Sequence, residues 1–384
     1  METSAHVSTT GGSSSKQPDA ELRVSSLELF FDIVFVFTIT QLTSLLAQQL
    51  SLTSGVQVFL IFVVLFWMYG GYAWLTNQVP PASTTRRLLL IAGMAAFFVC
   101  AMAIPRAFAD SGLAFGLGYL LVVLVHSGLY AQVHGRVVLR FVPFNVAGAA
   151  CLIVASQLSG AAAYALWMLP VPLQYVASRL AGGVDESAGG GFDIRPSHFV
   201  ERHGGLLIVV LGESIVAVGI GVADLTLDAI TIATAVLGLA IGAGLWWAYF
   251  GVDEKQAEVS LRAAALNDRV HMALFGYFYA FVPMLLGITS FAAGVKLTIS
   301  TIEARLALGP AVLLGGGIGL YLIGDALFRR AMHIPQGWHR LAIAAVALTT
   351  ILLGTAFSGL VQLSVLLATL VVMLVIDTRQ MIAR

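Results

Sequence analysis

The segment SLELFFDIVFVFTITQLTSLLAQQ, residues 26–49, is long and apolar enough to cross a membrane as a single helix. Such a helix needs about 20 mostly apolar residues. Eleven similar runs follow it along the chain, at 54–76, 86–108, 111–133, 137–158, 160–180, 198–220, 227–250, 269–292, 307–328, 338–357 and 359–377. We therefore expect an all-α polytopic membrane protein with about 12 transmembrane helices.

Two pairs of these runs are joined by very short connections, 137–158 with 160–180 and 338–357 with 359–377. Each pair is either two full spans or a hairpin that contains a re-entrant piece. The sequence therefore predicts between ten and twelve passes, with twelve as the preferred number.

The composition excludes a water-soluble protein. Apolar residues make up 59% of the 384 residues and charged residues 10%, and the mean hydropathy is +0.92. Soluble domains have roughly 45–50% apolar and about 25% charged residues, and disordered chains have low hydrophobicity. The 20 basic and 20 acidic residues balance, so no overall positive field favours nucleic acid. Cys100 and Cys151 have no Cys or His at metal-ligand spacing, and we expect neither a metal nor a cofactor.

The basic residues predict how the chain is oriented in the membrane. Of the 20 Lys and Arg residues, Arg106, Lys296 and Arg305 fall on one side, which leaves 17 on the side that holds both termini. Cytoplasmic loops are enriched in Lys and Arg. We therefore expect both termini in the cytoplasm. Of the 20 basic residues, 17 are Arg and 3 are Lys, which suggests a GC-rich bacterial genome and hence the bacterial inner membrane.

Two polar segments divide the chain. Residues 1–24 are rich in Ser, Thr and Gly and lack the apolar region of a signal peptide, so we expect a disordered cytoplasmic tail. Residues 181–197, AGGVDESAGGGFDIRPS, predict a cytoplasmic linker because they are rich in Gly and acidic residues. The membrane halves 25–180 and 198–384 then contain six helices each.

Similar residues recur in the same order in the two halves. Glu28 and Glu201 open the first and the seventh predicted helices, and a W-x-Y motif occurs in the second and the eighth. His126 in the fourth helix has Asp325 as its counterpart in the tenth, and the offset grows from 173 to 199 positions. A growing offset is expected if the second copy carries loop insertions. An odd number of helices per repeat would invert the second copy in the membrane, whereas six helices keep it parallel. We therefore expect two tandem six-helix repeats in parallel orientation.

Ionisable side chains inside a bilayer cost about 2.5–3.5 kcal/mol each, so the few within the apolar runs are candidate functional residues. Ser25 and Glu28 have the S-x-x-E spacing of a capping box, so Glu28 is either a helix cap or part of a site. Asp32 lies one turn further along the same face and is too deep for a cap. Its carboxylate belongs either to a structural pair with an arginine or to a functional site.

The seventh run begins with HFVERHG, residues 198–204. Glu201 lies in the first turn and favours the helix dipole. Arg202 and His203 are either interfacial groups whose polar ends reach water or members of a site. The spacing H-x-x-E-x-H differs from H-E-x-x-H, and no third ligand is placed, so we expect no zinc site.

Glu213 lies about midway along the same run, where no capping role is available. It is either a proton-carrying or solute-binding carboxylate or a structural hydrogen-bonding group. His126, in an apolar run, either titrates or bonds a backbone or hydroxyl group. Asp325 is four residues before Arg329, so it is either part of a local ion pair or a functional acid.

Aromatic residues gather toward the predicted cytoplasmic ends of the second and the eighth helices, among them Trp67, Tyr69, Trp247 and Tyr249. Trp and Tyr are enriched at membrane–water interfaces. These side chains therefore form either an interfacial belt or the lining of a ligand site, and the sequence leaves both alternatives open.

Four motifs point to a known family: SSLELFFDIVFVF at 25–37, FWMYGGYAWLTN at 66–77, HFVERHG at 198–204 and LGESI at 211–215. In these motifs, in their order and in its length, the chain resembles the bacterial low temperature requirement A family of integral membrane proteins. The family takes its name from a cold-growth phenotype. The resemblance therefore implies a multi-pass membrane protein and assigns no biochemical activity.

The preferred function is a secondary transporter, proton-coupled, or a channel for a small polar solute or ion. In this hypothesis Glu213, with Asp32 or His126, carries a proton or binds the solute near the middle of the membrane. Convergence of these three residues on one cavity would favour transport. The expected partners are the lipid bilayer and this solute.

The alternative is an integral-membrane enzyme that acts on a lipid or another apolar substrate. Glu28, Asp32, Glu201 and His203 would then form an acid–base cluster near the cytoplasmic face. No nucleophile motif, metal set or cofactor loop accompanies these residues in the sequence.

Overall fold

The computed structural model describes residues 24–134, 141–181, 194–335 and 337–382. These residues are mostly helical, and no strand occurs among them. Ten helices in the described part are long and apolar enough to cross a membrane, which confirms the all-α polytopic membrane fold. Residues 1–23 of the predicted tail and most of the predicted linker 181–197 lie outside the described residues.

The N-terminal half contains α1 (Ser26–Gln48), α2 (Leu52–Gln78), α3 (Thr84–Ala103), α4 (Gly112–His134), α5 (Val142–Ala155), α6 (Gly160–Met168) and α7 (Pro170–Ala181). The C-terminal half contains α8 (Pro196–Val222), α9 (Ala229–Phe250), α10 (Asp253–Ala263), α11 (Leu266–Ala273), the π-helical segment η4 (Leu274–Ala280), α12 (Phe281–Thr298), α13 (Leu308–Ala331), α14 (Trp338–Ala356) and α15 (Gly359–Ile382). The short 3-10 segments η1 (Ile104–Arg106) and η5 (Ile299–Thr301) extend α3 and α12.

The fifth and sixth predicted passes differ from the other ten. The run 137–158 forms the 14-residue helix α5, and the run 160–180 is divided at Leu169 into α6 and α7. Pro170 accounts for the break, because proline has no N–H to donate and its ring clashes with the carbonyl of the residue four positions earlier. The run pair 338–357 and 359–377 forms two separate long helices, α14 and α15.

Local sequence signals set several helix starts. Ser25 forms both halves of a capping box with Glu28 at the start of α1, as its spacing predicts. Ser51, Ser83 and Asp228 accept backbone hydrogen bonds at the starts of α2, α3 and α9.

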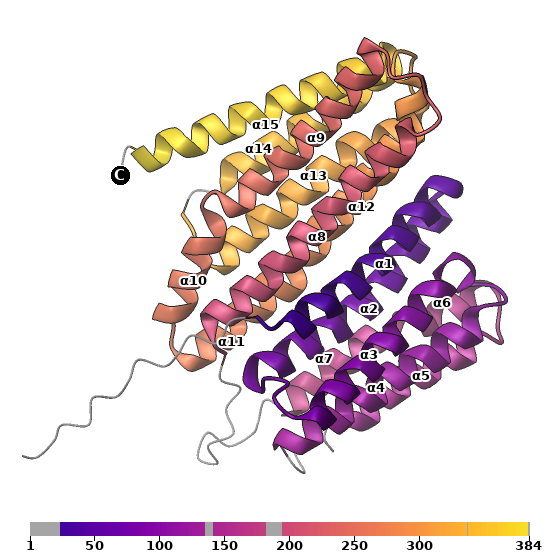
Figure 1. Ribbon diagram of the computed structural model, residues 1–384, viewed down its shortest axis with the longest axis vertical. Coiled ribbons are helices and arrows are strands. Elements are labelled where there is room, and N and C mark those ends of the chain that lie inside the picture. Colours follow the sequence, from indigo (N-terminus) through magenta and orange to yellow (C-terminus); the bar gives the residue numbers. More distant parts are fainter. Residues whose placement is uncertain (1–23, 135–140, 182–193, 336, 383–384) are drawn as a thin grey trace, which may run out of the picture.

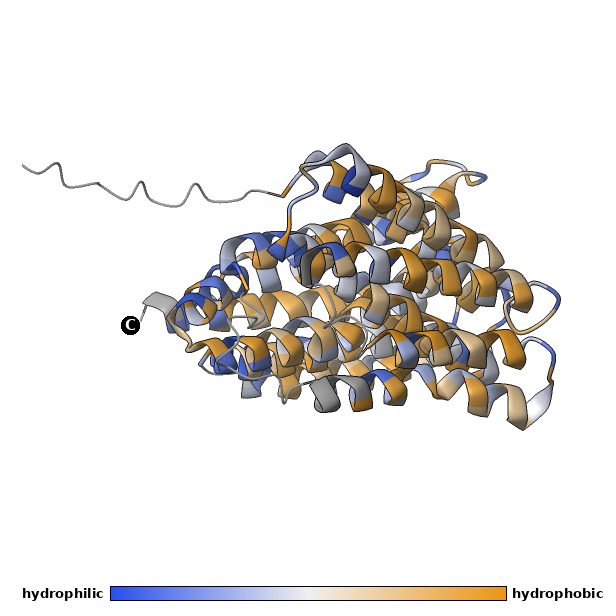
Figure 2. Cartoon of the chain, turned by 90° about the horizontal axis from the view of Figure 1, so that it is seen from below, coloured by the Kyte–Doolittle hydropathy of each residue, from blue (hydrophilic) through white to orange (hydrophobic). Residues whose placement is uncertain are grey.

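The two halves lie side by side (Figure 1), and α1 and α2 of the first half contact α8 and α12 of the second. Apolar residues cover most of the long helices, while hydrophilic residues gather at the helix ends and in the loops (Figure 2). This distribution is typical of a multi-pass membrane protein. The six-helix duplication remains a prediction.

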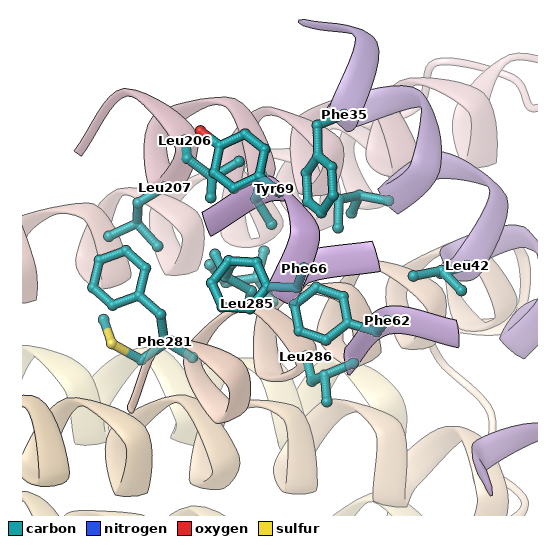
Figure 3. Close-up of a cluster of buried hydrophobic side chains, with 14 of the residues drawn as sticks. Phe35, Leu42, Phe62, Phe66, Tyr69, Leu206, Leu207, Phe281, Leu285 and Leu286 are labelled. Carbon is teal, nitrogen blue, oxygen red and sulfur yellow. The ribbon is translucent and has the colours of Figure 1, made fainter. Parts of the chain in front are cut away.

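Apolar and aromatic side chains fill the space where the halves meet (Figure 3). Phe35 and Tyr69 from the first half are in ring contact, with centroids 4.6 Å apart. Leu206 and Leu207 on α8 and Phe281 on α12 belong to the same buried cluster. The core therefore runs without interruption from one half to the other.

The closest helix contact that glycines permit lies between α12 and α13. A Cβ atom on Gly317 would lie 2.7 Å from the carbonyl oxygen of Gly287 and 2.7 Å from the backbone nitrogen of Phe291. We expect Gly317→Ala to lower the free energy of unfolding by about 1–3 kcal/mol, because the two backbones must separate. The melting temperature of the detergent-purified protein measures this loss.

Gly316 provides the matched control on the same helix. The nearest atom to an added Cβ there is Val312 Cγ1 at 3.7 Å, which is an ordinary contact. Gly316→Ala should leave the melting temperature unchanged or slightly raised. Equal melting temperatures for the two variants would show that the close approach does not matter.

Candidate functional site

Helices α1 and α8 lie against each other along the junction of the halves, which we call the seam (Figure 1). Glu28 and Asp32 are four residues apart on α1, so they share one helix face. His198 and Arg202 have the same spacing on α8. The two faces meet, and the four side chains form a buried network, each at most 2% exposed.

Asp32 is the centre of this seam network. Its Oδ1 lies 3.0 Å from Nη2 of Arg202 and accepts a hydrogen bond of 2.7 Å from the Tyr69 hydroxyl. The Arg202 guanidinium also lies 5.8 Å from the ring centres of both Phe31 and Tyr69, within cation–π range. The other carboxylate oxygen, Oδ2, is buried and has no hydrogen-bond partner among the described residues.

Glu28 combines its capping role with a second contact across the seam. Its Oε2 accepts hydrogen bonds of 2.8 Å from both the backbone and the hydroxyl of Ser25. Its Oε1 lies 3.3 Å from Nε2 of His198 and 3.7 Å from Nη1 of Arg202. The capping box therefore fixes a carboxylate that also holds the two halves together.

The protonation of His198 follows from its neighbour Asn77. The backbone N–H of Arg195 donates to Asn77 Oδ1 at 3.0 Å, which leaves the Asn77 amide nitrogen as a donor. That nitrogen lies 3.3 Å from His198 Nδ1, so Nδ1 is an acceptor and carries no proton. His198 is then neutral and donates from Nε2 to Glu28. The seam network holds two carboxyl groups and one permanent cation, Arg202.

A second level of the seam holds Glu213. Its Oε2 accepts a hydrogen bond of 2.6 Å from the Thr40 hydroxyl on α1. Thr40 is eight residues beyond Asp32, about 12 Å along the helix. Lys296 on α12 acts electrostatically on Glu213 and donates to Ser44 at 3.4 Å. The seam therefore carries carboxylates at two depths.

The structure does not bring Glu213, Asp32 and His126 to one cavity. His126 lies on α4, with its ring centre 5.1 Å from that of Tyr72, and its Nε2 has no hydrogen-bond partner within the described part of the chain. The convergence that we set as favourable to transport through all three residues is absent.

Three residues of the HFVERHG motif, near the start of α8, lie in three different environments. Arg202 is buried and paired, which excludes the alternative in which its polar end reaches water at the interface. His203 also does not reach water, because its Nδ1 bonds the carbonyl of Phe199 at 2.8 Å and its ring packs against Tyr277. Glu201 is exposed and accepts a bond of 3.4 Å from the backbone N–H of Val24.

The proposed acid–base cluster of an enzyme is therefore not assembled as expected. Of its four members, only Glu28 and Asp32 lie together, and they face His198 and Arg202 instead of Glu201 and His203. His198 belongs to the seam network although the sequence argument gave it no role. Its spacing of four residues from Arg202 was the signal that could have identified it.

The aromatic candidate residues also lie in different surroundings. Tyr69 belongs to the seam network, and Tyr249 is buried with its hydroxyl 3.5 Å from that of Tyr277. Trp67 contacts the ring of Phe278 on η4, with centroids 5.6 Å apart. Trp247 is 57% exposed, as expected for an interfacial belt.

Asp325 belongs to a separate buried network in the C-terminal half. Its Oδ2 is bound by Nη1 of Arg340, so its ion pair is with a distant arginine and not the local pair with Arg329 that was one of the two alternatives. Arg329 instead lies 3.4 Å from each of Asp253 and Asp377. Arg340 and Asp377 also lie within predicted membrane passes. Asp325 became a candidate because an ionisable side chain in a bilayer is costly, and the same reason applied to these two residues. No group of three or more His, Cys, Asp or Glu side chains in the described ranges is placed to hold a metal ion.

Comparison with known proteins connects these features with a family. A family model described as bacterial low temperature requirement A protein matches residues 23–376. Among curated proteins, an uncharacterized protein of Rhizobium meliloti (strain 1021) is 25% identical over 332 residues. The similarity covers 82% of this chain and 79% of that protein. The family match includes every residue of the seam network.

Proposed function

The chain belongs to the bacterial low temperature requirement A family, and we propose that it is a proton-coupled secondary transporter for a small polar solute or ion in the bacterial inner membrane. One observation carries the proposal. The seam between the two halves holds buried carboxylates at two depths, with the Glu28, Asp32, Arg202 and His198 network at one end and Glu213 further along.

The charge of the seam network supports proton binding. With His198 neutral, two ionised carboxylates face one guanidinium, and the network carries one uncompensated negative charge. A buried charge without a partner is costly, so the network is suited to bind one proton. Asp32 is the acceptor that we assign. Each of the two carboxylates has one buried oxygen without a hydrogen-bond partner among the described residues. Glu28 already receives three donors on Oε2, from Ser25 and His198. Asp32, in contrast, accepts one hydrogen bond, from Tyr69, beside its ion pair with Arg202.

The position of the network supports coupling. Asp32 lies on α1 in the first half, and Arg202 lies on α8 in the second. A proton on Asp32 removes its charge and weakens the ion pair that joins the halves. The halves can then move relative to each other, which is the motion that alternating access requires.

A small cavity lies near the network, on the side that the sequence predicts as cytoplasmic. Thr76, which interacts with Glu28, also lines a cavity of about 20 Å³ between α2, α3 and α4. That volume is about enough for one water molecule. Leu90 and Arg86 line the same cavity, and Arg86 lies at the start of α3.

Glu213→Gln should abolish transport without preventing membrane insertion. Glutamine keeps the size of the side chain and the hydrogen bond from Thr40 but cannot carry a proton. The assay uses proteoliposomes loaded with the pH-sensitive dye pyranine, to which amino acids, sugars and alkali-metal salts are added in turn. We expect at least one class to move protons with the wild type and none to do so with the variant.

Glu303→Gln is the matched control, because Glu303 is exposed. It should transport at the wild-type rate. Full activity in Glu213→Gln would remove Glu213 from the mechanism, and proton movement that needs no added solute would indicate a channel.

A further inference from the structure

A second buried charge network lies entirely within the C-terminal half. It joins four helices, α10, α13, α14 and α15, near the ends that carry the C-terminus of α13 and the start of α14 (Figure 1). Its members are Asp253, Asp325, Arg329, His339, Arg340 and Asp377. All six are at most 9% exposed, and Asp253 and Asp325 are fully buried.

Asp377 is fully bonded in this network. Its Oδ1 lies 2.7 Å from His339 Nε2 and 3.4 Å from Arg329 Nη1. Its Oδ2 lies 2.8 Å from Nη2 of Arg340. Three donors on two oxygens are the surroundings of an ionised carboxylate.

Asp253 has very different surroundings. Its nearest cationic nitrogens are Nη2 of Arg329 at 3.4 Å and Nη2 of Arg340 at 3.8 Å, both long for ion pairs. Neither carboxyl oxygen has a hydrogen-bond partner in the described part of the chain, although the side chain is 0% exposed. Asp325 is bound by Arg340 through Oδ2, while its Oδ1 is also without a partner among those residues. Asp253 and Asp325 lie against the same guanidinium, that of Arg340, through Nη2 and Nη1, and their carboxyl groups act electrostatically on each other.

The network thus contains three carboxyl groups and two guanidinium groups, with one carboxyl left without donors beside another. We propose that Asp253 and Asp325 share one bound proton, which makes this pair a second proton-binding site, in the C-terminal half. The proton lies on one carboxyl and is donated to the other in an O–H···O⁻ hydrogen bond. That bond gives a partner to one oxygen of Asp253 and to Oδ1 of Asp325, and it reduces the network to two negative and two positive charges.

His339 does not need to carry the extra proton. One ring N–H is enough for its bond to Asp377, and its other nitrogen, Nδ1, is buried without a hydrogen-bond partner in the described ranges. Adding a proton at Nδ1 would create a buried donor without a partner and leave the oxygens of Asp253 as they are. Other groups that act on the pair are Tyr249 on α9, Tyr277 on η4, Tyr321 on α13 and the Asp377 carboxylate on α15.

The site lies outside the seam and does not depend on the transport proposal. Asp253 is the first residue of α10, whereas its partners belong to α13–α15. The shared proton therefore stabilises the contact between the start of α10 and the rest of the C-terminal half. Loss of the proton would place two like charges beside each other in a buried position, which disfavours that contact.

Infrared spectroscopy of the purified full-length protein tests the site without any transport assay. A neutral carboxylic acid has a carbonyl-stretching band that is separate from the carboxylate bands and shifts in D₂O. A shared proton predicts that Asp253→Asn and Asp325→Asn each remove the same component of this band, because either change leaves one ionised carboxylate near two arginines. Asparagine keeps the size of the side chain, and gel filtration confirms that each variant is folded.

Asp110→Asn and Asp32→Asn are the controls. Asp110 is an exposed surface residue, and its loss should leave the spectrum unchanged. Asp32→Asn can remove only a different component, because Asp32 lies on α1 in the other half. If both Asp253→Asn and Asp325→Asn keep the complete wild-type band, or if only one of them changes it, the two residues do not share a proton.

Discussion

Replacing Arg202 with methionine should lower the free energy of unfolding by about 3–5 kcal/mol. The reason is the set of groups that it leaves behind. Asp32 and Glu28 are each only 1% exposed. Both would lose the Arg202 guanidinium, which lies 3.0 Å from Asp32 and 3.7 Å from Glu28. Breaking a buried ion pair on one side strands a charge that water cannot reach. The loss is measured as a fall in the melting temperature of the detergent-purified protein.

Two controls distinguish the cost of stranding buried carboxylates from the cost of replacing any arginine. Arg106→Met removes an exposed pair with Asp110 at 3.0 Å and should cost at most about 1 kcal/mol. Adding Glu28→Gln and Asp32→Asn to Arg202→Met removes every charge together and should restore most of the lost stability. Similar small shifts for Arg202→Met and Arg106→Met would contradict the buried network.

The sequence predicted the helices well because the signal for a membrane helix is local. Runs of about 20 apolar residues identified the ten long helices, and the Ser25 and Glu28 spacing predicted the cap of α1. The exceptions are also local in cause, since Pro170 divides the sixth run. Helix α10 was missed because its sequence, DEKQAEVSLRA, is polar and resembles a loop between passes.

The site was less predictable, because it depends on which helices meet. Asp32 required a cationic or hydrogen-bonding partner, but nothing local indicated that Arg202, 170 residues later, would supply it. The direction in which each side chain points around the helix axis determined which other residues joined the site. His203 follows Arg202 directly in the sequence, but it points into an aromatic cluster, whereas His198 shares the face of Arg202. Helix contacts of this kind cannot be derived from spacing on one helix.

Asp32→Asn should abolish solute-driven proton movement while leaving the protein folded. Asparagine is similar in size, and it can still accept the hydrogen bond from Tyr69 and a weaker one from Arg202. Glu28 remains as the counter-charge for the arginine. Because asparagine cannot bind a proton, the link between protonation and the contact of the halves is lost. The rate of proton movement should fall to that of liposomes without protein.

The most direct test of the seam as the coupling site is this same rate, measured by internal pyranine in proteoliposomes given the solute that drives protons in the wild type. Asp110→Asn serves as the matched control at an exposed position. The account predicts wild-type proton movement for Asp110→Asn and none above the protein-free level for Asp32→Asn, at equal amounts of inserted protein. Wild-type proton movement in Asp32→Asn would contradict it.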